Sequence, residues 1–541
     1  MRMTCQEHMQ TMIRKRKWLI RIAVATMLGI VALFVTASIL ARRFEPYIRE
    51  QTIEYLRKRF DSDVELTALR VHLPETSLLR LLLTKGRGAL AHVEGEGISL
   101  RYKGRRDVPP MFAMKKFRFE VDLGKLFDTP KTVQSVLLEG MEISIPPKGE
   151  RPELSAGSSP EKTSGSQTWV LIKDVTIQDA RLLILPKDRT KVPLEFFIRD
   201  LRLNSAGMGV AMRYNAALTN PRPPGAIHAV GSFGPWNAEE PGDTPLSGDY
   251  TFEKADLGVF AGIAGILNST GHFEGTLDSI HAKGQASVPD FRLKMAGNPV
   301  PLVTQFEALI DGTNGNTMLQ PVRAMLGTTR FTTSGGVIKH ESDLQRTISL
   351  DVSMPQGDLR DLLRLAVKGT PFMEGQIFLK TKIDIPPLMG KVREKLKLDG
   401  RFEVQHGKFL RFTTQDKIDS LSRRGQGKPN SEEIDEVVSG MKGTFKLENE
   451  VIRFRSLSFS VSGAKVALKG NYDLQRDALD FHGTLKLQAK VSQTMTGWKR
   501  WALKPVDPFF VKGGAGTFLR IKVTGTSKAA KFGSDRGNKG P

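Results

Sequence analysis

The chain has 541 residues, of which 40% are hydrophobic, so it is long enough to form several folded units and lies outside the composition of disordered proteins. Its formal net charge of +22 and its isoelectric point of about 9.9 predict an anionic partner, such as nucleic acid, phospholipid headgroups or an acidic polymer. A single cysteine, Cys5, excludes a disulfide within the chain and a thiolate metal site in the rest of it.

Residues 22–41 form an uncharged apolar run that is as long as a helix needs to cross a bilayer. A basic cluster at 14–17 precedes it, and the positive-inside rule then places residues 1–21 in the cytoplasm and the rest of the chain outside. The alternative is a cleaved signal peptide with its cleavage site at 35–37, but the apolar run continues past that site. We therefore predict a single-pass anchor in a bacterial inner membrane, with the bulk of the chain in the periplasm, and four residues mark this anchor: Ile22, Leu28, Phe34 and Leu40.

An exported location argues against nucleic acid as the partner of the positive charge, and the chain shows no basic helix with interleaved aromatic residues. Membrane headgroups are then the better partner.

Short alternating apolar patterns follow the predicted anchor. Residues 44–60 predict an interfacial or packing helix. Strands are predicted from the alternation at 64–74, 117–123, 136–146, 169–185, 210–219, 227–233 and 246–253. Two short helices are predicted at 255–269 and 357–369, and the Ser-, Gly- and Pro-rich stretch 148–168 predicts a linker or surface loop.

The C-terminal stretch 457–474 carries the clearest alternation. Its apolar residues occupy every second position and, with the next strand, make one apolar face: Leu457, Phe459, Val461, Val466, Leu468, Phe481, Leu485 and Leu487. From periodicity alone, the core of an ordinary β-sandwich explains this face better than an exposed apolar surface does.

Two internal repeats are visible. Asp256-Leu257 is followed by Phe273-Glu274-Gly275 at nearly the distance that separates Asp358-Leu359 from Met373-Glu374-Gly375. A second repeat matches seven positions at a constant offset: Leu319, Val322, Ala324, Leu326, Phe331, Thr333 and Gly335 correspond to Phe454, Leu457, Phe459, Val461, Val466, Leu468 and Gly470. A repeated strand-rich unit suggests a sheet that grows by addition of strands, although a duplicated compact domain fits it as well.

Signatures of catalysis are not found. No two of the nine histidines stand at metal-ligand spacing, and the chain has no G-x-S-x-G elbow and no phosphate-binding loop. We therefore expect no enzyme activity, no cofactor and no metal, while a site made of paired carboxylates stays open because its geometry is three-dimensional.

Three C-terminal segments, 398–421, 437–487 and 501–533, resemble the AsmA-like C-terminal region, including the closing "IKVTGT" and the short tail "AKF". The basic flank, the single apolar run, the "YLRKRF" helix end and the strand "VELTALRV" resemble the N-terminal order of the same family, which includes AsmA, TamB and YhdP. Ala530 stands where the family tail commonly has a proline, and the chain is shorter than the largest members.

The resemblance implies a mainly β fold, in which an N-terminal transmembrane helix is followed by an elongated, curved antiparallel β-sheet groove with a few short helices. It divides the chain into a basic N-terminus (1–21), the anchor (22–41), an N-terminal β region (42–147), a linker (148–168), a repeated β-groove region (169–397), the C-terminal region (398–533) and a basic tail (534–541).

The function that the resemblance implies is the binding and movement of phospholipid between inner and outer membrane, in support of the integrity of the outer membrane and the cell envelope. The alternatives are a scaffold or assembly factor for outer-membrane proteins that adds a strand to an open sheet edge, and a regulatory envelope protein that carries no lipid.

Overall fold

The computed structural model describes residues 49–50, 53–54, 57, 62–72, 90–102, 104–122, 131–145, 170–185, 194–207, 210–235, 237, 240–296, 298–339, 346–387, 391–431, 439–496, 504, 507 and 516–535. The predicted membrane span 22–41 and the predicted linker 148–168 lie outside these residues. Within them, no helix has both the length and the apolar character that crossing a membrane requires. The described residues of the predicted helix 44–60 are helical.

Strands dominate both of the units into which contacts divide the chain, Met1–Met208 and Gly209–Pro541. The first unit contains β1 (Ser62–His72), β2 (Leu90–Tyr102), β3 (Phe112–Asp122), β4 (Lys131–Ile145), β5 (Val170–Ile184) and β6 (Leu194–Gly207). The protein is therefore mainly β with few helices, as the sequence predicts.

The second unit contains β7 (Met212–Pro221), β8 (Pro224–Phe233), β9 (Pro245–Asp256), β10 (Ile263–Ala264), β11 (Ile266–Thr276), β12 (Ser279–Val288), β13 (Arg292–Leu293), β14 (Leu302–Ile310), β15 (Thr317–Leu326), β16 (Thr329–Ile338), β17 (Thr347–Asp358), β18 (Met373–Ile385), β19 (Lys397–Phe409), β20 (Ser439–Glu448), β21 (Val451–Val461), β22 (Ala464–Asp473), β23 (Ala478–Leu487), β24 (Thr517–Gly525) and β25 (Ala530–Ser534). Its short helices are η2 (Pro241–Asp243), η3 (Leu257–Val259), α3 (Leu359–Ala366), α4 (Val392–Lys395), α5 (Phe412–Gly425) and η4 (Val491–Thr494).

In the first unit, β1 to β6 form a sheet in sequence order. All neighbours are antiparallel except β4 and β5, which are parallel. Parallel neighbours need a connection that returns the chain to the edge where the first strand began, unlike the short turns of antiparallel hairpins. This sheet is thus antiparallel with one exception that the sequence did not predict.

A line of irregular positions crosses all six strands of the first sheet at one level. The regular pairing between neighbouring strands is interrupted at six residues, one on each strand: Thr67, Gly97, Lys115, Gly140, Asp179 and Arg199. Three of them, Gly97, Gly140 and Asp179, have left-handed φ angles of 65°, 62° and 51°. On β1, the buried positions change there from Val64 and Leu66 to Leu69. Because every strand shifts at the same level, the apolar residues stay on one face of the sheet.

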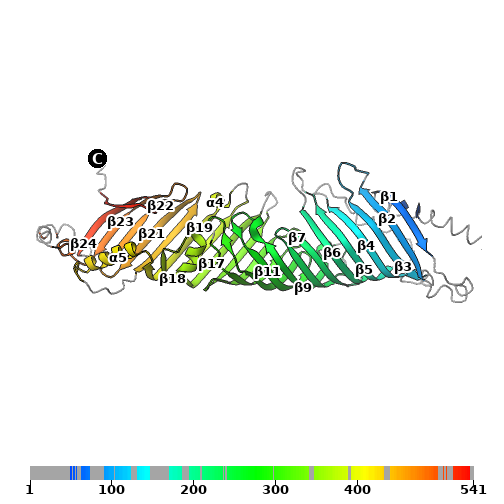
Figure 1. Ribbon diagram of the computed structural model, residues 1–541, viewed down its shortest axis with the longest axis horizontal. Helices are drawn as coiled ribbons and strands as arrows, with labels where there is room; N and C mark the ends of the chain where they lie inside the picture. Colours follow the sequence, from blue (N-terminus) through cyan, green and yellow to red (C-terminus); the bar gives the residue numbers. More distant parts are fainter. Residues whose placement is uncertain are drawn as a thin grey trace, which may run out of the picture. The chain divides into compact units, whose positions relative to one another are not determined.

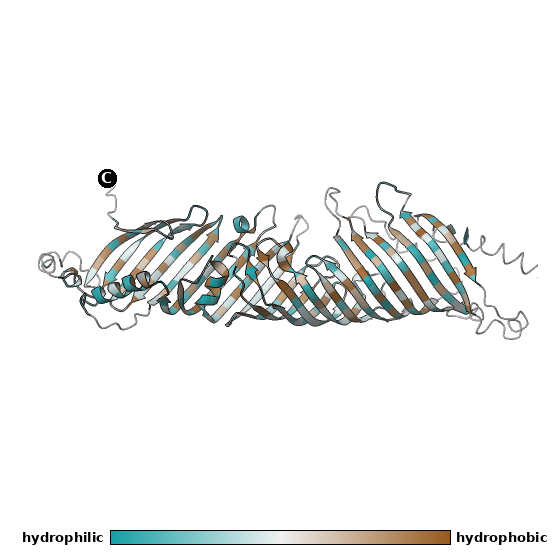
Figure 2. Ribbon diagram, viewed as in Figure 1, coloured by the Kyte–Doolittle hydropathy of each residue, from teal (hydrophilic) through white to brown (hydrophobic). Residues whose placement is uncertain are grey.

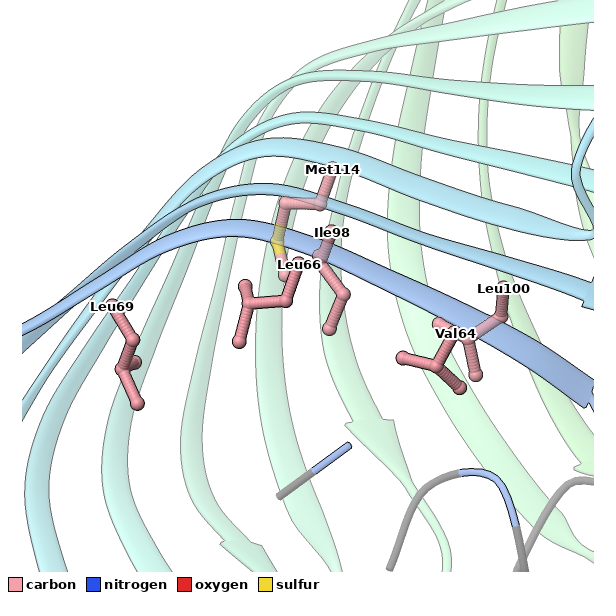
Figure 3. Close-up of a cluster of buried hydrophobic side chains, with 6 residues drawn as sticks. All are labelled: Val64, Leu66, Leu69, Ile98, Leu100 and Met114. Carbon is pink, nitrogen blue, oxygen red and sulfur yellow. The ribbon is translucent and has the colours of Figure 1, made fainter. Parts of the chain in front are cut away.

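That apolar face carries the core of the first unit. Val64, Leu66, Leu69, Ile98, Leu100 and Met114 form one cluster on the same side of β1, β2 and β3 (Figure 3). Ile53, from the described part of the helix that precedes β1, packs against this cluster, so the helix has a packing role within the unit.

In the second unit, the strands form a second ladder, and each one pairs with the strand next to it in sequence. Only β10 and β13 leave this ladder, where they form a separate pair. Figure 1 shows the order from β7 to β24, and Figure 2 shows hydrophobic and hydrophilic residues alternating along the strands. Among the described residues, each strand of the ladder makes extensive strand contacts only with its neighbours in the ladder, while β10 and β13 contact each other. No second layer of strands packs on the sheet in this part of the chain, so the sheet is a single open layer.

The helix predicted at 357–369 is confirmed by α3, but the one predicted at 255–269 is wrong. The only helical element there is the short η3 turn, which is followed by β10 and by β11 from Ile266. Gly262 and Gly265 between them have φ angles of 93° and 138°, which a right-handed helix does not allow. Both segments begin alike, however, since Asp256 caps η3 and Asp358 caps α3 through their side chains.

The second internal repeat corresponds to the same hairpin built twice. Val322 pairs with Thr333 in β15–β16, and Leu457 pairs with Leu468 at the matching position of β21–β22. Both hairpins carry a register shift at the same place, between 319 and 322 and between 454 and 457. The constant sequence offset therefore reflects an identical strand pairing with an identical bulge.

Candidate functional site

The eight apolar residues singled out at 457–487 come together on one face of β21, β22 and β23. Phe459, Val466 and Leu485 lie directly opposite one another across the three strands. The other five lie in other rows of the same face. Leu457 is opposite Leu468, and Phe481 is opposite Gly470. Val461 and Leu487 share a row because each is opposite Ala464, which lies between them. The register thus places all eight on the same side of the sheet, as the alternation predicts.

These rows continue well beyond the three strands. One row runs from β17 to β24 and contains Met354, Leu379, Phe402, Gly443, Leu457, Leu468, Gly483 and Ile521. The next row contains Val352, Thr381, Gly400, Phe445, Phe454, Gly470, Phe481 and Val523. We call the surface made by these rows and by that of Phe459 the apolar face. The sequence prediction missed its residues on β17–β20 and β24, although the alternation at 398–404 and 517–523 carries the same signal.

Phenylalanine rings follow one another across the apolar face. The ring centroids lie 6.2 Å apart for Phe402 and Phe445, 6.4 Å for Phe445 and Phe454, and 5.7 Å for Phe454 and Phe481, with the planes tilted by 45–54°. Such tilted contacts are favourable between aromatic rings. The ring of Phe402 also lies against Gly443, where a Cβ would come within 2.9 Å of it. Because Gly443 has no side chain, the ring of Phe402 can lie close to the sheet.

Helix α5 covers one border of the apolar face. Its Ile418 and Leu421 pack on a cluster formed by Val461, Ala464 and Leu487, with Phe459 and Leu485 at the margin. The eight predicted residues are therefore not equivalent. Val461 and Leu487 belong to a covered cluster, while Leu457, Val466, Leu468 and Phe481 lie outside it.

Helix α3 covers the same border further along the ladder. Its Leu359 is buried with Met354, Met373, Ile377 and Val404, and Leu362 and Leu363 pack on this cluster. Both helices follow strands that end at this border, β17 for α3 and β19 for α5 (Figure 1). The row of Leu457 and Leu468 belongs to the α3 cluster or packs on it at its β17–β19 end, through Met354, Leu379 and Phe402, but from β20 to β24 it belongs to neither cluster. In the described part of the chain, no helix packs extensively elsewhere on this face of β19–β23.

Polar atoms on the corresponding face of the preceding strands are paired internally. The hydroxyl of Tyr214 donates to the carbonyl of Ser247 at 3.2 Å, and that of Tyr250 lies 3.1 Å from the Ser269 hydroxyl, which donates to the Gln285 carbonyl. Burial raises the pKa of both tyrosines above the ordinary value, so both phenols stay neutral at physiological pH. The face therefore presents no charge from these side chains.

On β19–β22, the face opposite the apolar face is polar and charged. Ala467, Lys465 and Lys469 on β22 are exposed, while Val466 and Leu468 between them are half-buried. Ion pairs join strands there, such as Arg455 of β21 with Asp399 of β19 at 3.2 Å across the intervening β20. Among the residues that the structure describes, no three His, Cys, Asp or Glu side chains are arranged to hold a metal ion.

Comparisons with protein-family models, with curated proteins and with solved structures find no match to this chain.

Proposed function

We propose that the protein is a member of the AsmA-like family that binds phospholipid acyl chains on its apolar face and conducts them between the inner and outer membranes. In this proposal, residues 22–41 anchor the chain in the inner membrane, and the lipid flow supports the integrity of the outer membrane. The observation that carries the proposal is the series of apolar rows from β17 to β24. Among the described residues, the row of Phe454 and Phe481, and the row of Leu457 and Leu468 from β20 onward, belong to neither helix-covered cluster.

The proposal requires the sheet to curve toward its apolar face and form a groove, and the two faces differ in their burial. Phe481 lies in an uncovered row, yet its side chain is only 6% exposed. On the opposite face, even the small side chains of Ser456 and Ala467 are exposed. In a single layer, such a difference is expected where the side chains of one face pack closely against one another.

The chemistry of the rows suits a ligand that must move. Each methylene group that leaves water contributes about 0.8 kcal/mol, so two acyl chains would be held strongly by the groove. Neighbouring strands present similar apolar rows, so a shift by one strand spacing of about 4.8 Å would change the binding energy little. Phospholipid headgroups would stay in water at the border of the groove that no helix covers.

Photo-crosslinking from two adjacent positions of β22 tests this function. A photoreactive phenylalanine analogue at Leu468 faces the proposed groove, while the same group at Ala467 faces the opposite side. In cells that express the full chain and are labelled with radioactive phosphate, we expect labelled phospholipid on the Leu468 protein and at least tenfold less on the Ala467 protein. Equal labelling of both, or of neither, would overturn the proposal.

A second candidate, a scaffold that adds a strand to its sheet edge, is favoured by β25. In the described part of the chain, β25 pairs only with β24, and its Phe532 is 79% exposed. Open strand edges of this kind accept strands from other chains. The same photoreactive group at Phe532 should crosslink to outer-membrane protein precursors if the scaffold function holds, and to none of them if lipid conduction is the only function.

A further inference from the structure

A shallow furrow crosses the polar face, on the other side of the sheet from the apolar rows. It has a volume of about 930 Å³ and extends over β17–β23. Its lining consists of two rows of polar-face residues and of the row between them, such as Phe402, Leu457 and Leu468, which the register assigns to the apolar face. Small side chains form its floor, among them Ser353, Thr444, Ser456, Ser458 and Thr484. Four cationic side chains, Lys380, Arg401, Lys442 and Lys469, line it together with His482.

Like charges lie directly opposite each other along this furrow. Lys380 pairs in register with Arg401, and Lys469 lies opposite His482, which is a like charge when its imidazole is protonated, whereas Lys442 lies opposite Glu403. Directly opposed residues of an antiparallel pair have Cβ atoms about 5 Å apart, and like charges there destabilise a sheet. The folded protein therefore holds these cations close together at a cost in stability.

The four cations of the furrow form no ion pair within the described residues, although cations outside it do. Lys397 and Lys446 both reach Glu448, at 3.0 and 3.1 Å. The furrow has one acidic lining residue, Glu403, whose carboxylate accepts a hydrogen bond from Gln405 at 3.0 Å. His482 is hydrogen-bonded to Asp480 and Asp535, which do not line the furrow. The furrow thus has an excess of positive charge that only an external anion can balance.

The shape and the chemistry of the furrow select among anions. From β18, which carries Lys380, to β22, which carries Lys469, the ladder advances four strand spacings, or about 19 Å. The hydroxyl groups of the floor suit hydrogen bonds with sugar hydroxyls, and Phe378 adds a half-buried aromatic ring to the lining. A bilayer surface is broader than the furrow, so it would meet the tips of the long side chains and leave the floor untouched.

We propose that this furrow binds a linear anionic polysaccharide. The acidic groups of the chain contact Lys380, Arg401, Lys442 and Lys469, and its sugar rings lie over the hydroxyl-bearing floor. This site is on the opposite face from the proposed lipid path and does not depend on it. The same protein would then hold a lipid on one side of its C-terminal sheet and an anionic glycan on the other.

Binding to defined polymers tests the proposal. The full chain in phosphatidylcholine nanodiscs should bind dextran sulfate and polygalacturonate, and should not bind uncharged dextran. The logarithm of the affinity should fall linearly with the logarithm of the salt concentration, as for other polyelectrolytes. Binding of uncharged dextran would overturn the proposal, as would equal affinity for polyphosphate, which lacks sugar rings, or displacement of dextran sulfate by phosphatidylglycerol vesicles.

A matched pair of double variants locates the site. Arg401→Gln with Lys469→Gln removes two furrow cations, while Lys417→Gln with Lys428→Gln removes two exposed cations on and just after α5. Exposed substitutions of this kind leave stability nearly unchanged. The furrow variant should bind dextran sulfate at least tenfold more weakly, and the control should stay within twofold of the unmodified protein. An equal loss in both variants would show a general effect of net charge and refute the furrow as the site.

The floor is tested by Ser458→Val, which removes a hydroxyl group without changing the charge. We expect at least a threefold loss of affinity for polygalacturonate. An unchanged affinity would refute the role of the floor in sugar recognition.

Discussion

Two aspartate substitutions in one hairpin should separate the covered border of the apolar face from its open middle. Val461 and Leu468 lie on the same face of β21 and β22, but Val461 packs under α5 and Leu468 does not. We predict that Val461→Asp destabilises the hairpin strongly, whereas Leu468→Asp leaves it folded and removes bound lipid.

The expected magnitudes come from the surroundings of each side chain. Val461 is 9% exposed, so losing its burial costs about 2 kcal/mol. A carboxyl group under α5 must also lose its charge. Protonating it costs about 1.4 kcal/mol for each unit by which the pH exceeds the ordinary pKa of aspartate, and neutral pH exceeds it by about three units, so the cost is about 4 kcal/mol. The sum of about 6 kcal/mol is an upper bound because α5 can move aside and admit water.

At Leu468, a carboxylate reaches water directly, so the loss is limited to the partial burial of leucine, about 1–2 kcal/mol. The same carboxylate would face passing acyl chains at a cost of several kcal/mol. Each 1.4 kcal/mol lowers binding tenfold, so lipid crosslinked from Leu457, its neighbour across the hairpin, should fall at least tenfold.

Hydrogen exchange on the full chain measures the opening free energy of α5 and of the β21–β22 hairpin, and crosslinking from Leu457 measures the lipid. We expect Val461→Asp to lower the opening free energy by at least 2 kcal/mol more than Leu468→Asp does. Equal destabilisation by the two variants would mean that the middle rows are an ordinary core. A stable Leu468→Asp protein that keeps its lipid would refute the lipid path.

Three further predictions concern single contacts. Asp361 is 6% exposed and accepts hydrogen bonds from the Thr328 amide and hydroxyl at 2.8 and 2.9 Å. Asp361→Ala should therefore lower the opening free energy of α3 by about 2–4 kcal/mol, which is measured as faster hydrogen exchange there. Unchanged exchange would contradict this. Gly97→Val forces a branched residue to a φ of 65° and against the side chain of Thr67, and should lower the opening free energy of β2 by about 1–3 kcal/mol; Gly533→Val in β25, where φ is not positive and no atom lies within 3.4 Å of the added Cβ, is its control. The hydrogen bond that His482 donates to the Asp535 carboxylate raises the pKa of His482 above its ordinary value, so its stabilising effect is present below the ordinary pKa and lost as pH rises through the raised one. Exchange of β25, corrected for intrinsic rates, should accelerate over that range, and His482→Gln should abolish the change.

Much of the strand pattern could be predicted from the sequence because alternation is a local property. The residues at 457–474 read as a two-stranded apolar face, and β21 and β22 form that face. The helix expected at 255–269 failed because its apolar residues fit a helix as well as a strand, and the conformation of Gly262 and Gly265 was decided by the turn they make. The parallel pairing of β4 with β5 is encoded in neither strand alone.

The candidate site was predictable only in part. Alternation identifies which residues share a face, but the cover that α5 places over Val461 is a tertiary contact with no sequence period. The furrow escaped prediction for a related reason. Lys380 and Arg401 are far apart in sequence, and their like-charged contact exists only once the register of β18 with β19 is known.

The order of the ladder from β7 to β25 bears on how this part of the protein is made. Each strand pairs with the strand synthesised just before it, apart from the excursions to β10 and β13, so the contacts are local and the loops to be closed are short. Hairpins can then become ordered one after another as the chain emerges, without waiting for its C-terminal end. Gain or loss of two consecutive strands would preserve both faces, so the length of the sheet can change in evolution while its cross-section stays the same.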